Sequence, residues 1–504
     1  MSKNKIRCQI NGVQVEVPEG TTVIEAIKKI NHEIAHYCWH PGLSVAGVCR
    51  LCVVDIEGQN KLQIACNTKV QEGMVISNQT DKVKEAVRWG LEFHLINHPL
   101  DCPICDQAGE CQLQDQYMKF GTYTPTMAER KVKKRKVVDL GSKIVLDTER
   151  CILCSRCVRF TDEVTKTHEL GIFNRGDQSE IGVFKDKPLE NDYALNTVDI
   201  CPVGALTAKD FRFQQRVWYM KTSSSICTGC STGCNISVDY NEEGLWRVRP
   251  RYNKKVNGYW MCDQGRGLYK KLNKKFRMDF AFESKNSQWK SLSSKEAIEK
   301  IKKTIPSQSK LAFVLTGQYM NEEYAALLKH FPKASYYHWL NDNKEEKDFD
   351  GLLLRSDKNP NTLGLKNTFP KIKTWLEFEK DPPSFECVFV LGPENIKFYP
   401  DLKQKSAVFS KCQKLIWMSV GFNSFLTPQK DFWQIPMKSF FEKTGEYTNF
   451  KGLKQKVEKT QTLVPQALDV DEFLKILKEE EYALKGTRPY FKNNQFLEKT
   501  DKLW

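Results

Sequence analysis

The sequence predicts a multidomain protein in which several small α+β domains precede one α/β domain. Three observations predict this architecture. A length of 504 residues is enough for three to five domains. Sixteen of the 18 cysteines precede residue 263, and fifteen of these fall into four spaced groups, each able to organise a compact α+β domain. Beyond residue 285, short apolar runs alternate with glycines and helical patterns, as in an α/β fold.

Composition narrows the class of protein. Hydrophobic residues make up 40% of the chain, which is enough for packed cores. No segment approaches the roughly 20 apolar residues that a membrane helix requires. The first residues, MSKNKIRC, contain no apolar stretch like that of a secretory signal. We therefore expect a soluble chain facing the cytoplasm, with no direct membrane insertion.

The formal net charge is +15. Such an excess of basic residues suits nucleic acid, an anionic membrane or an acidic protein partner, or it simply solvates the surface. No nucleic-acid recognition motif accompanies the charge, so we expect no nucleic-acid partner. If the cysteines bind metal clusters as thiolates, these sites carry negative charge that the formal net charge does not include. Basic residues around such sites would partly offset this negative charge.

The first eighty residues predict a small domain with a metal-binding loop. Two alternating runs flank Asn11-Gly12, a pair that predicts a hairpin with a type I′ turn. Cys8 lies inside the first strand and is predicted to be a packing residue. A capped helix follows, and then a loop that bears cysteines. This order is typical of a β-grasp ferredoxin, which we place at residues 1–80.

The first cysteine group has the spacing C-x10-C-x2-C-x13-C and consists of Cys38, Cys49, Cys52 and Cys66. One close pair with two separated ligands suits a [2Fe–2S] cluster, in which two thiolates bind each iron. The alternative is a zinc site, which usually shows two close pairs. We therefore predict a [2Fe–2S] cluster.

The second group has the spacing H-x3-C-x2-C-x5-C, in a helical segment placed at residues 81–125, and consists of His98, Cys102, Cys105 and Cys111. Soft or borderline ligands this close in sequence could bind zinc or a [4Fe–4S] cluster, and spacing alone does not choose between them. His94, four residues earlier on a predicted helix, is a competing ligand.

The third group, placed in a domain at residues 140–215, is half of a known double pattern. Bacterial two-cluster ferredoxins repeat C-x2-C-x2-C-x3-C-P, and the fourth cysteine of each run ligates the other cluster. This template finds all four ligands of one cluster, namely Cys151, Cys154, Cys157 and Cys201. At the positions of the other cluster it finds Thr161, Asn191, Ala194 and Thr197. The joint loss predicts a two-cluster ferredoxin fold that retains one [4Fe–4S] cluster.

The fourth group, placed at residues 220–278, has the spacing C-x2-C-x3-C-x27-C and consists of Cys227, Cys230, Cys234 and Cys262. It resembles the [4Fe–4S] domain with which molybdopterin oxidoreductases begin, including formate dehydrogenases; zinc is the alternative. Formate dehydrogenases carry Cys-x-Lys-Gly, whose lysine helps connect cluster and pterin, but here Gln264 replaces that lysine. We therefore predict a cluster that is structural or off the main electron path.

The last segment, residues 285–490, predicts an α/β domain. Apolar runs at 311–315, 387–391 and 415–418 predict buried strands. Cys387 and Cys412 are predicted to be core residues rather than ligands.

A later stretch, from Phe441 to Gln455, resembles the E-x-x-G-x-x-x-N-x-x-G-x-x-Q stretch of the molybdopterin family. About 220 residues remain after the fourth group, too few for that family's usual pterin-binding subdomains. We predict a truncated molybdopterin-oxidoreductase-like domain that binds no molybdopterin.

The run HPLDCPICDQAGECQLQD around the second group carries the main resemblance. It resembles the cluster motif shared by the G subunit of NADH–quinone oxidoreductase (respiratory complex I), iron-only hydrogenases and related diaphorase subunits. The resemblance implies that one histidine and three cysteines hold a [4Fe–4S] cluster, with His98 as the histidine ligand. Iron-only hydrogenases resemble the ferredoxin form with two clusters. The form in this chain, which keeps only one of the two clusters, is compatible with the G subunit. Many mitochondrial versions lack the fourth group, so the chain most resembles the bacterial-type G-subunit family.

The resemblance implies an electron relay in the peripheral arm of that complex, at the cytoplasmic face of the inner (cell) membrane, with one [2Fe–2S] and three [4Fe–4S] clusters. Electrons would come from the NADH- and FMN-binding subunit, pass through the binuclear, all-cysteine tetranuclear and histidine-ligated clusters, and leave to quinone-side iron–sulfur subunits. The chain has no G-x-G-x-x-G after a strand and no P-loop, so no nucleotide site and no catalytic residue are expected. Two alternatives stay open: an iron–sulfur subunit of a formate dehydrogenase or hydrogenase complex, and a zinc-binding interaction protein.

Overall fold

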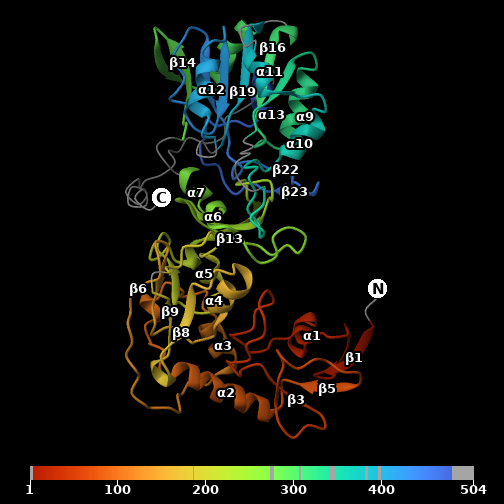
Figure 1. Ribbon diagram of the computed structural model, residues 1–504, viewed down its shortest axis with the longest axis vertical. Coiled ribbons are helices and arrows are strands. Elements are labelled where there is room, and N and C mark those ends of the chain that lie inside the picture. The colour runs from red at the N-terminus through yellow and green to blue at the C-terminus, as the bar shows by residue number, and fades with distance from the viewer. Residues whose placement is uncertain are drawn as a thin grey trace. The chain divides into compact units, whose positions relative to one another are not determined.

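The computed structural model describes residues 4–185, 187–272, 277–305, 308–340, 348–380, 384–394 and 399–478. The chain divides into two compact units, Met1–Tyr219 and Met220–Trp504 (Figure 1). The end of the predicted α/β domain, residues 479–490, lies outside the described residues. Within the described part of the chain, no helix combines the length and the apolar character that crossing a membrane requires.

The first unit begins with a five-stranded mixed sheet in the order β2-β1-β5-β3-β4. The predicted hairpin is confirmed, because β1 and β2 pair antiparallel and both Asn11 and Gly12 have positive φ, as a type I′ turn requires. Strand β5 joins β1 in parallel, and α1 packs its apolar face on the sheet. Thr22 and Glu25 form a capping box at the start of α1. The bounds are β1 Lys5–Ile10, β2 Val13–Pro18, α1 Val23–Lys29, β3 Val53–Ile56, β4 Gln63–Ile64 and β5 Met74–Ser77.

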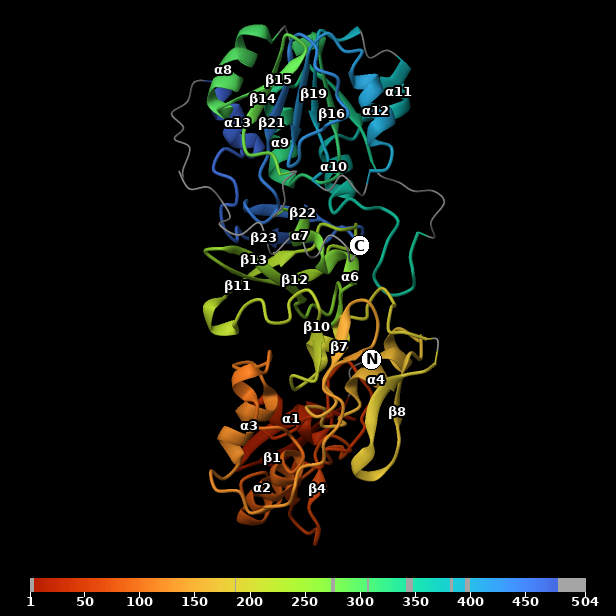
Figure 2. The same cartoon turned by 90° about the vertical axis from the view of Figure 1, so that its left-hand side faces the viewer.

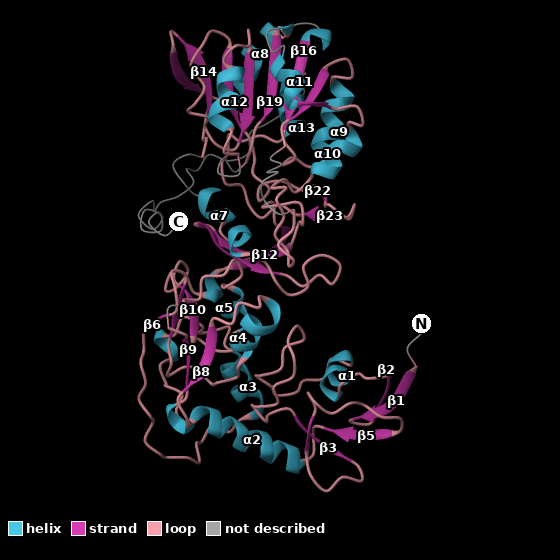
Figure 3. Cartoon of the chain, in the orientation of Figure 1, coloured by secondary structure: helices cyan, strands magenta, loops and turns pink. Residues whose placement is uncertain are grey.

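The rest of the first unit is rich in loops. Helix α2 (Asp81–Leu95) packs on β3 (Figure 3), and a 3-10 turn at Cys102–Ile104 leads to α3 (Gln112–Phe120). A three-stranded sheet in the order β10-β7-β6 and the hairpin β8–β9 follow. The remaining bounds are β6 Val138–Asp139, β7 Ile144–Leu146, α4 Arg156–Arg159, a π-helical turn Phe160–Val164, β8 Leu170–Phe173, a 3-10 turn Gly176–Gln178, β9 Glu180–Val183, α5 Asn196–Ile200, β10 Leu206–Ala208 and a 3-10 turn Val217–Tyr219.

One apolar core joins these loops into a single body. It runs from Leu51 in the first cysteine loop through Leu91 of α2 to Leu146 of β7 and Leu206 of β10. Burial of such side chains contributes about 1.5–3 kcal/mol each. The first three cysteine groups are therefore held by one continuous core.

The second unit begins with the antiparallel sheet β11-β12-β13, followed by two short helices. The turn between β11 and β12 and the start of the first short helix carry the fourth cysteine group. The bounds are β11 Lys221–Ile226, β12 Asn235–Asn241, β13 Gly244–Pro250, α6 Asp263–Arg266 and α7 Leu268–Leu272.

An eight-stranded sheet in the order β15-β14-β21-β20-β19-β16-β17-β18 forms most of the second unit. The predicted strands are confirmed, because 311–315 is β16, 387–391 is β19 and 415–418 lies in β20. The bounds are β14 Ala281–Lys285, β15 Gln288–Leu292, α8 Ser294–Thr304, a 3-10 turn Gln308–Lys310, β16 Leu311–Leu315, α9 Asn321–His330, β17 Ser335–His338, α10 Thr362–Thr368, β18 Lys373–Thr374, α11 Trp375–Lys380, β19 Cys387–Leu391, α12 Leu402–Phe409, β20 Leu415–Ser419, β21 Phe432–Pro436 and α13 Val470–Leu477.

Helices cover both faces of this sheet, with α8 and α13 on one side and α11 and α12 on the other (Figure 2). The parallel strands are therefore buried on both faces, which is why β16, β19 and β20 are continuous apolar runs rather than alternating ones. The rings of Phe313 and Phe389 stack between β16 and β19 with centroids 4.8 Å apart. Cys387 and Cys412 are both buried, as the sequence predicts for core residues.

The strand that follows β16 in the chain, β17, pairs with one edge of β16, and the later strand β19 pairs with the other edge. The topological switch point of the parallel sheet therefore lies between β16 and β19. A separate hairpin, β22 (Gly445–Thr448) and β23 (Lys454–Val457), contacts α9 and α10 through β22 and β11 through β23 (Figure 1).

Candidate functional site

The cysteines of the first group lie together as two hydrogen-bonded pairs. Cys38 pairs with Cys49, and Cys52 pairs with Cys66. All four are buried, and the hydrogen bond from Cys49 lowers the pKa of Cys38 to about 5. The backbone N–H of Tyr37 also donates to Cys49 Sγ, at 3.4 Å. Two pairs of sulfurs suit a cluster with two irons and two thiolates on each.

Three sulfurs of the second group also lie near one another, because the charges of Cys105 and Cys102 both act on Cys111. Arg216 holds their loop by donating to the carbonyls of Cys105 (2.6 Å) and Pro103 (2.7 Å). Gly204 approaches Cys105 Sγ so closely that a Cβ at this position would overlap the sulfur. Sequence reasoning missed Gly204, whose only signal is its place three residues after Cys201.

His98 is mostly buried, and its Nδ1 has no hydrogen-bond partner. Burial lowers its pKa to about 4, so the ring is neutral at pH 7 and keeps a lone pair for a metal. The ring lines a cavity of about 250 Å³ together with Glu149 and Cys151. Within the described residues the ring makes no hydrogen bond to the cysteines of its own group.

The competing histidine, His94, is already engaged. Its Nδ1–H donates to the carbonyl of Gly90 at 2.7 Å, within α2. Its ring packs edge-on against Tyr37, with centroids 5.1 Å apart. Because Tyr37 precedes Cys38, His94 lies near the first group, and it also lines the same cavity as His98.

All four sulfurs of the third group line one small cavity. The other walls are mostly apolar and include Leu146, Ile152, Ile181, Ala205 and Leu206. Burial raises the pKa of Cys151 to about 12 and that of Cys154 to about 11, so free thiols here stay protonated until a metal displaces the proton. Leu153 and Ser155 both have positive φ, a strained conformation that wraps the loop around the sulfurs.

At two template positions of the lost second cluster, the side chains form hydrogen bonds within the protein. Thr161 and Thr197 are both buried. Their hydroxyls donate to backbone carbonyls, that of Thr161 to Val158 at 2.9 Å and that of Thr197 to Ala194 at 2.8 Å. These side chains now serve local backbone packing.

The cysteines of the fourth group are all buried, and the charges of the other three act on Cys234. Cys227 and Cys234 close the turn between β11 and β12 through a hydrogen bond of 2.8 Å from Cys227 N to the Cys234 carbonyl. Cys262 caps α6, where its Sγ accepts from Gly265 N at 3.3 Å. A Cβ on Gly265 would meet Cys227 Sγ at 2.7 Å, so only glycine fits between the two sulfurs. Gln264 is exposed on the first turn of α6.

The β22–β23 hairpin holds the turn of the fourth group. Gln455 Nε2 donates to the Gly233 carbonyl at 2.9 Å, and Asn449 Nδ2 donates to the Thr232 carbonyl at 3.3 Å. Gly233 has positive φ, which exposes its carbonyl to this contact. These two side chains are the asparagine and glutamine of the molybdopterin-type stretch, which here acts as a clamp on the cysteine turn.

The glutamate of the same stretch, Glu442, anchors the clamp to the domain. Its Oε1 accepts from the backbone N–H groups of Leu463 (2.7 Å) and Val464 (2.8 Å). Its Oε2 pairs with Arg277, and both side chains are buried.

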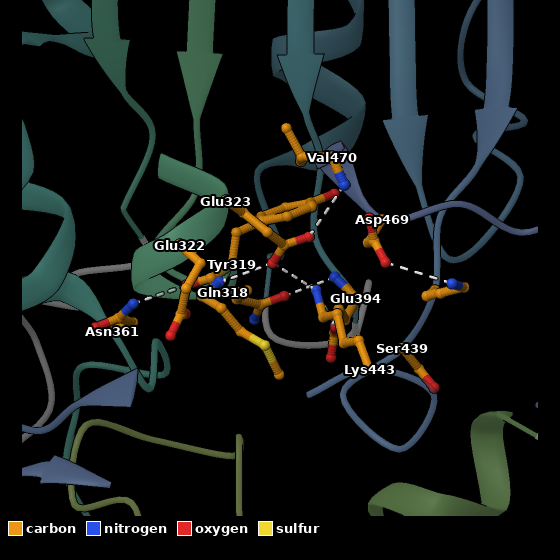
Figure 4. A network of polar contacts seen from close by, with 12 residues as sticks. Gln318, Tyr319, Glu322, Glu323, Asn361, Glu394, Ser439, Lys443, Asp469 and Val470 are labelled. Carbon is orange, nitrogen blue, oxygen red and sulfur yellow. Dashed lines mark hydrogen bonds and ion pairs between the residues drawn. The ribbon is translucent and has the colours of Figure 1, made fainter. Parts of the chain in front are cut away.

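A second buried polar network lies at the carboxyl ends of β16 and β19 (Figure 4). Lys443 Nζ pairs with Glu323 at 2.8 Å and with Glu394 at 3.8 Å, and it lies 4.8 Å from the centroid of the Tyr319 ring. The N–H of Glu394 donates to Gln318 Oε1 at 2.5 Å. Burial raises the pKa of Glu394 to about 7. Sequence analysis missed this network, although polar residues directly after parallel strands are a recognisable signal.

The donor sets fit iron–sulfur clusters on three grounds. The sulfurs of each group gather in buried or half-buried sites, glycines stand where a Cβ would meet a sulfur, and a neutral histidine leaves Nδ1 open. Within the described residues, no three His, Cys, Asp or Glu side chains are arranged to hold a single metal ion.

Four family models match the chain in order. They are the 2Fe-2S iron-sulfur cluster binding domain over residues 3–81, the NADH-ubiquinone oxidoreductase-G iron-sulfur binding region over 90–125, the ferredoxin-like domain of NADH-quinone oxidoreductase subunit 3 over 141–207, and the molybdopterin oxidoreductase Fe4S4 domain over 220–274. These matches indicate binding of 2Fe–2S and 4Fe–4S clusters.

Similar proteins agree with these models. The NADH-quinone oxidoreductase G subunit of Rickettsia bellii is 40% identical over 304 residues, which are 60% of this chain and 44% of the relative. The mitochondrial NADH dehydrogenase [ubiquinone] iron-sulfur protein 1 of Solanum tuberosum is 39% identical over 291 residues, 57% of this chain and 39% of the relative. The solved structure of an NAD+-reducing [NiFe]-hydrogenase in the H2-reduced state is 27% identical and has a TM-score of 0.39, covering 43% of this chain and 92% of its own.

The matched region thus spans less than half the length of the two curated relatives. Identity of about 40% and the match to the oxidoreductase-G binding region nevertheless agree on one relationship. This chain is related to the G subunit of NADH-quinone oxidoreductase, as the resemblance of the motif around His98 implies.

Proposed function

We propose that this chain is the electron-transfer subunit of an NADH–quinone oxidoreductase and relays single electrons from the NADH- and FMN-binding subunit toward quinone. The observation that carries the proposal is that predicted ligands lie close together: all four cysteines of the third group line one cavity, and the charges of the other three cysteines of the fourth group act on Cys234. Its partners would be that flavin subunit and the quinone-side iron–sulfur subunits, in a complex at the cytoplasmic face of the inner (cell) membrane.

The proposal gives each donor set one cluster. Cys38, Cys49, Cys52 and Cys66 hold a [2Fe–2S] cluster, and three [4Fe–4S] clusters are held by His98, Cys102, Cys105 and Cys111, by Cys151, Cys154, Cys157 and Cys201, and by Cys227, Cys230, Cys234 and Cys262. The domains would be residues 1–80, 81–125, 140–215 and 220–278, with a truncated molybdopterin-oxidoreductase-like domain at 285–490 that binds no molybdopterin.

When bound, such clusters supply one-electron carriers. The chain's own residues bind and shield them. Apolar walls such as Ile181 and Leu206 keep water from the third group, which strengthens electrostatic interactions at the site. Neutral His98 in place of a thiolate makes its set less negative and favours a higher reduction potential. We expect no substrate site on the chain itself, so turnover would belong to the assembled enzyme.

Metal analysis and EPR of the purified chain test the proposal. We expect about 14 irons per chain, no stoichiometric zinc or molybdenum, and cluster signals after reduction. A colourless protein with about four zinc ions would show the zinc-binding interaction protein instead. Turnover of formate or hydrogen by the purified protein would show the dehydrogenase or hydrogenase alternative.

A further inference from the structure

A buried arginine, Arg156, joins the loops of the first and third cysteine groups. The residue is only 3% exposed. Its Nη2 donates to the carbonyl of Trp39 at 2.8 Å, and its Nη1 donates to the carbonyl of Ile200 at 3.0 Å. Trp39 directly follows Cys38, and Ile200 directly precedes Cys201. The guanidinium therefore bridges the backbone beside one predicted ligand of each group.

The charge of Arg156 has no carboxylate counter-ion among the residues that the structure describes. Both hydrogen-bond partners are neutral carbonyls, and Nε has no partner. Across the described ranges of the chain, no carboxylate pairs with this side chain. The charges of the sulfurs of Cys154, Cys201 and Cys38 act on it favourably, and the charge of Arg159 opposes them. A buried cation is costly without an anion nearby, and sulfurs that bind iron as thiolates in net-negative clusters would provide one.

A second buried arginine shows the contrast. Arg150, directly before Cys151, has a side chain that is 5% exposed. It bonds to Asp101 at 2.7 and 3.2 Å and pairs with Asp147 at 3.3 Å. Its charge is balanced inside the protein. Of these two arginines beside the third group, Arg156 alone directs an unbalanced charge at the sulfurs.

Neighbouring cations add to the positive charge of Arg156 near these sulfurs. Arg159 Nη2 donates to the carbonyl of Cys38 at 2.5 Å and to that of Cys154 at 3.4 Å. Lys28 Nζ lies 4.7 Å from the centroid of the Trp39 ring. Positive charge therefore gathers where the two loops meet.

Resting on the function proposed above, we propose that Arg156 is a positioning residue of the relay that holds the first and third groups together and raises the reduction potentials of both clusters. A nearby cation stabilises the reduced form, which carries one more negative charge than the oxidised form. Arg156 makes and breaks no bond. With clusters bound, one electron lost by the set of Cys38 would be gained by the set of Cys201, and the guanidinium would stay a fixed positive charge between them.

The test is a redox titration, followed by EPR, of the assembled complex carrying Arg156→Gln. We expect the midpoint potentials of the binuclear and the all-cysteine tetranuclear signals both to fall, each by at least a tenfold change in the one-electron equilibrium, or about 59 mV. The potential of the cluster at Cys227–Cys262 should not move. Arg88→Gln, an exposed arginine on α2, is the matched control and should leave every potential unchanged.

Full iron content with both potentials unchanged in Arg156→Gln overturns the inference. If Arg156→Gln assembles without iron, Arg156→Lys decides, because its single ammonium group keeps the charge but does not span both carbonyls. In Arg156→Lys, iron bound with both potentials within about 59 mV of those in the unmodified complex supports the role of the charge. Loss of iron, or a fall of either potential by more than that, overturns it. Absence of iron from the unmodified chain would instead refute the proposed function, so the two failures are distinguishable.

Discussion

At the scale of single residues, burial and the nearest partners set the charge of each buried side chain. His98 is neutral because burial is not compensated by a carboxylate in direct contact. Arg277 is paired with Glu442, and Lys443 is paired with Glu323, so each of these buried cations has a carboxylate beside it. Each of these states follows from the neighbours of the side chain rather than from its residue type.

Glu394 makes the stability of the second unit depend on pH. Burial raises its pKa to about 7 from an ordinary value of 4.5, so the folded protein holds the proton more tightly than the unfolded chain. The stabilising effect is complete below pH 4.5 and is lost as the pH rises through about 7, a change on the order of 3 kcal/mol. Urea unfolding at pH 5 and pH 8, followed by tryptophan fluorescence, should show this loss.

The variant Glu394→Gln should remove that pH dependence, because glutamine carries no titratable proton. The unmodified chain should lose stability relative to this variant between pH 5 and pH 8. Parallel stability curves for the two proteins would contradict the role given to Glu394.

At the scale of elements, strand pairing and a hairpin clamp decide which loops are rigid. The turn of the fourth group belongs to β11 and β12, but the side chains that hold it come from the β22–β23 hairpin. A loop that has no apolar core can still be ordered when side chains from a distant element form hydrogen bonds to it. The shape of this turn therefore depends on the α/β part of the second unit.

Removing the clamp should weaken the fourth donor set alone. In Asn449→Ala/Gln455→Ala, two buried hydrogen bonds to the turn are lost, each worth about 1 kcal/mol. We expect the EPR signal of the fourth cluster to broaden or to disappear faster with an iron chelator, while the other signals persist. Gln288→Ala, an exposed position on β15, is the control. Equal chelation rates in both variants would argue against a clamp.

The sheet of the second unit should be sensitive to loss of its stacked rings. Phe389 is fully buried on β19 and stacks on Phe313. Phe389→Ala should cost about 3–5 kcal/mol in unfolding free energy, because the cavity left behind cannot collapse between two helical layers. Phe280→Ala, at a position 52% exposed, should cost far less in the same denaturant titration. Similar losses would show that β19 is not in the core.

At the scale of the whole molecule, the four donor sets differ in how they are connected. The first three share one apolar core in the first unit, and the third set is linked to the first by Arg156 and Arg159. The fourth set lies in the second unit and lacks the lysine that pterin enzymes carry at the position of Gln264. On the function proposed above, the first three sets would hold the relay clusters, and the fourth cluster is predicted to be structural or off the main electron path.

Two cysteine variants of the assembled enzyme separate these roles. Cys154→Ser should remove the all-cysteine tetranuclear EPR signal and abolish electron transfer from NADH to quinone. Cys230→Ser should remove the signal of the fourth cluster and leave most of the turnover. Equal losses of turnover in the two variants would place the fourth cluster on the electron path.

The sequence by itself determined the features that are local along the chain. The Asn11-Gly12 turn, the apolar strands β16, β19 and β20, and the close cysteine pairs all depend on neighbours a few residues away. Hydrophobic periodicity, turn-forming residues and ligand spacing act over such short distances, so they can be recognised from the sequence alone. The motif around His98, which resembles that of the G subunit of the oxidoreductase, is likewise local along the chain.

Only the tertiary structure decided the contacts between distant segments. Arg156 and Trp39 are 117 residues apart in the chain, and Gln455 and Gly233 are 222 residues apart, yet each pair shares a hydrogen bond. The burial that shifts the pKa of Glu394 and the approach of Gly204 to Cys105 likewise arise from packing. Residue types along a chain do not reveal which distant groups will meet, because burial and long-range pairing are properties of the folded core.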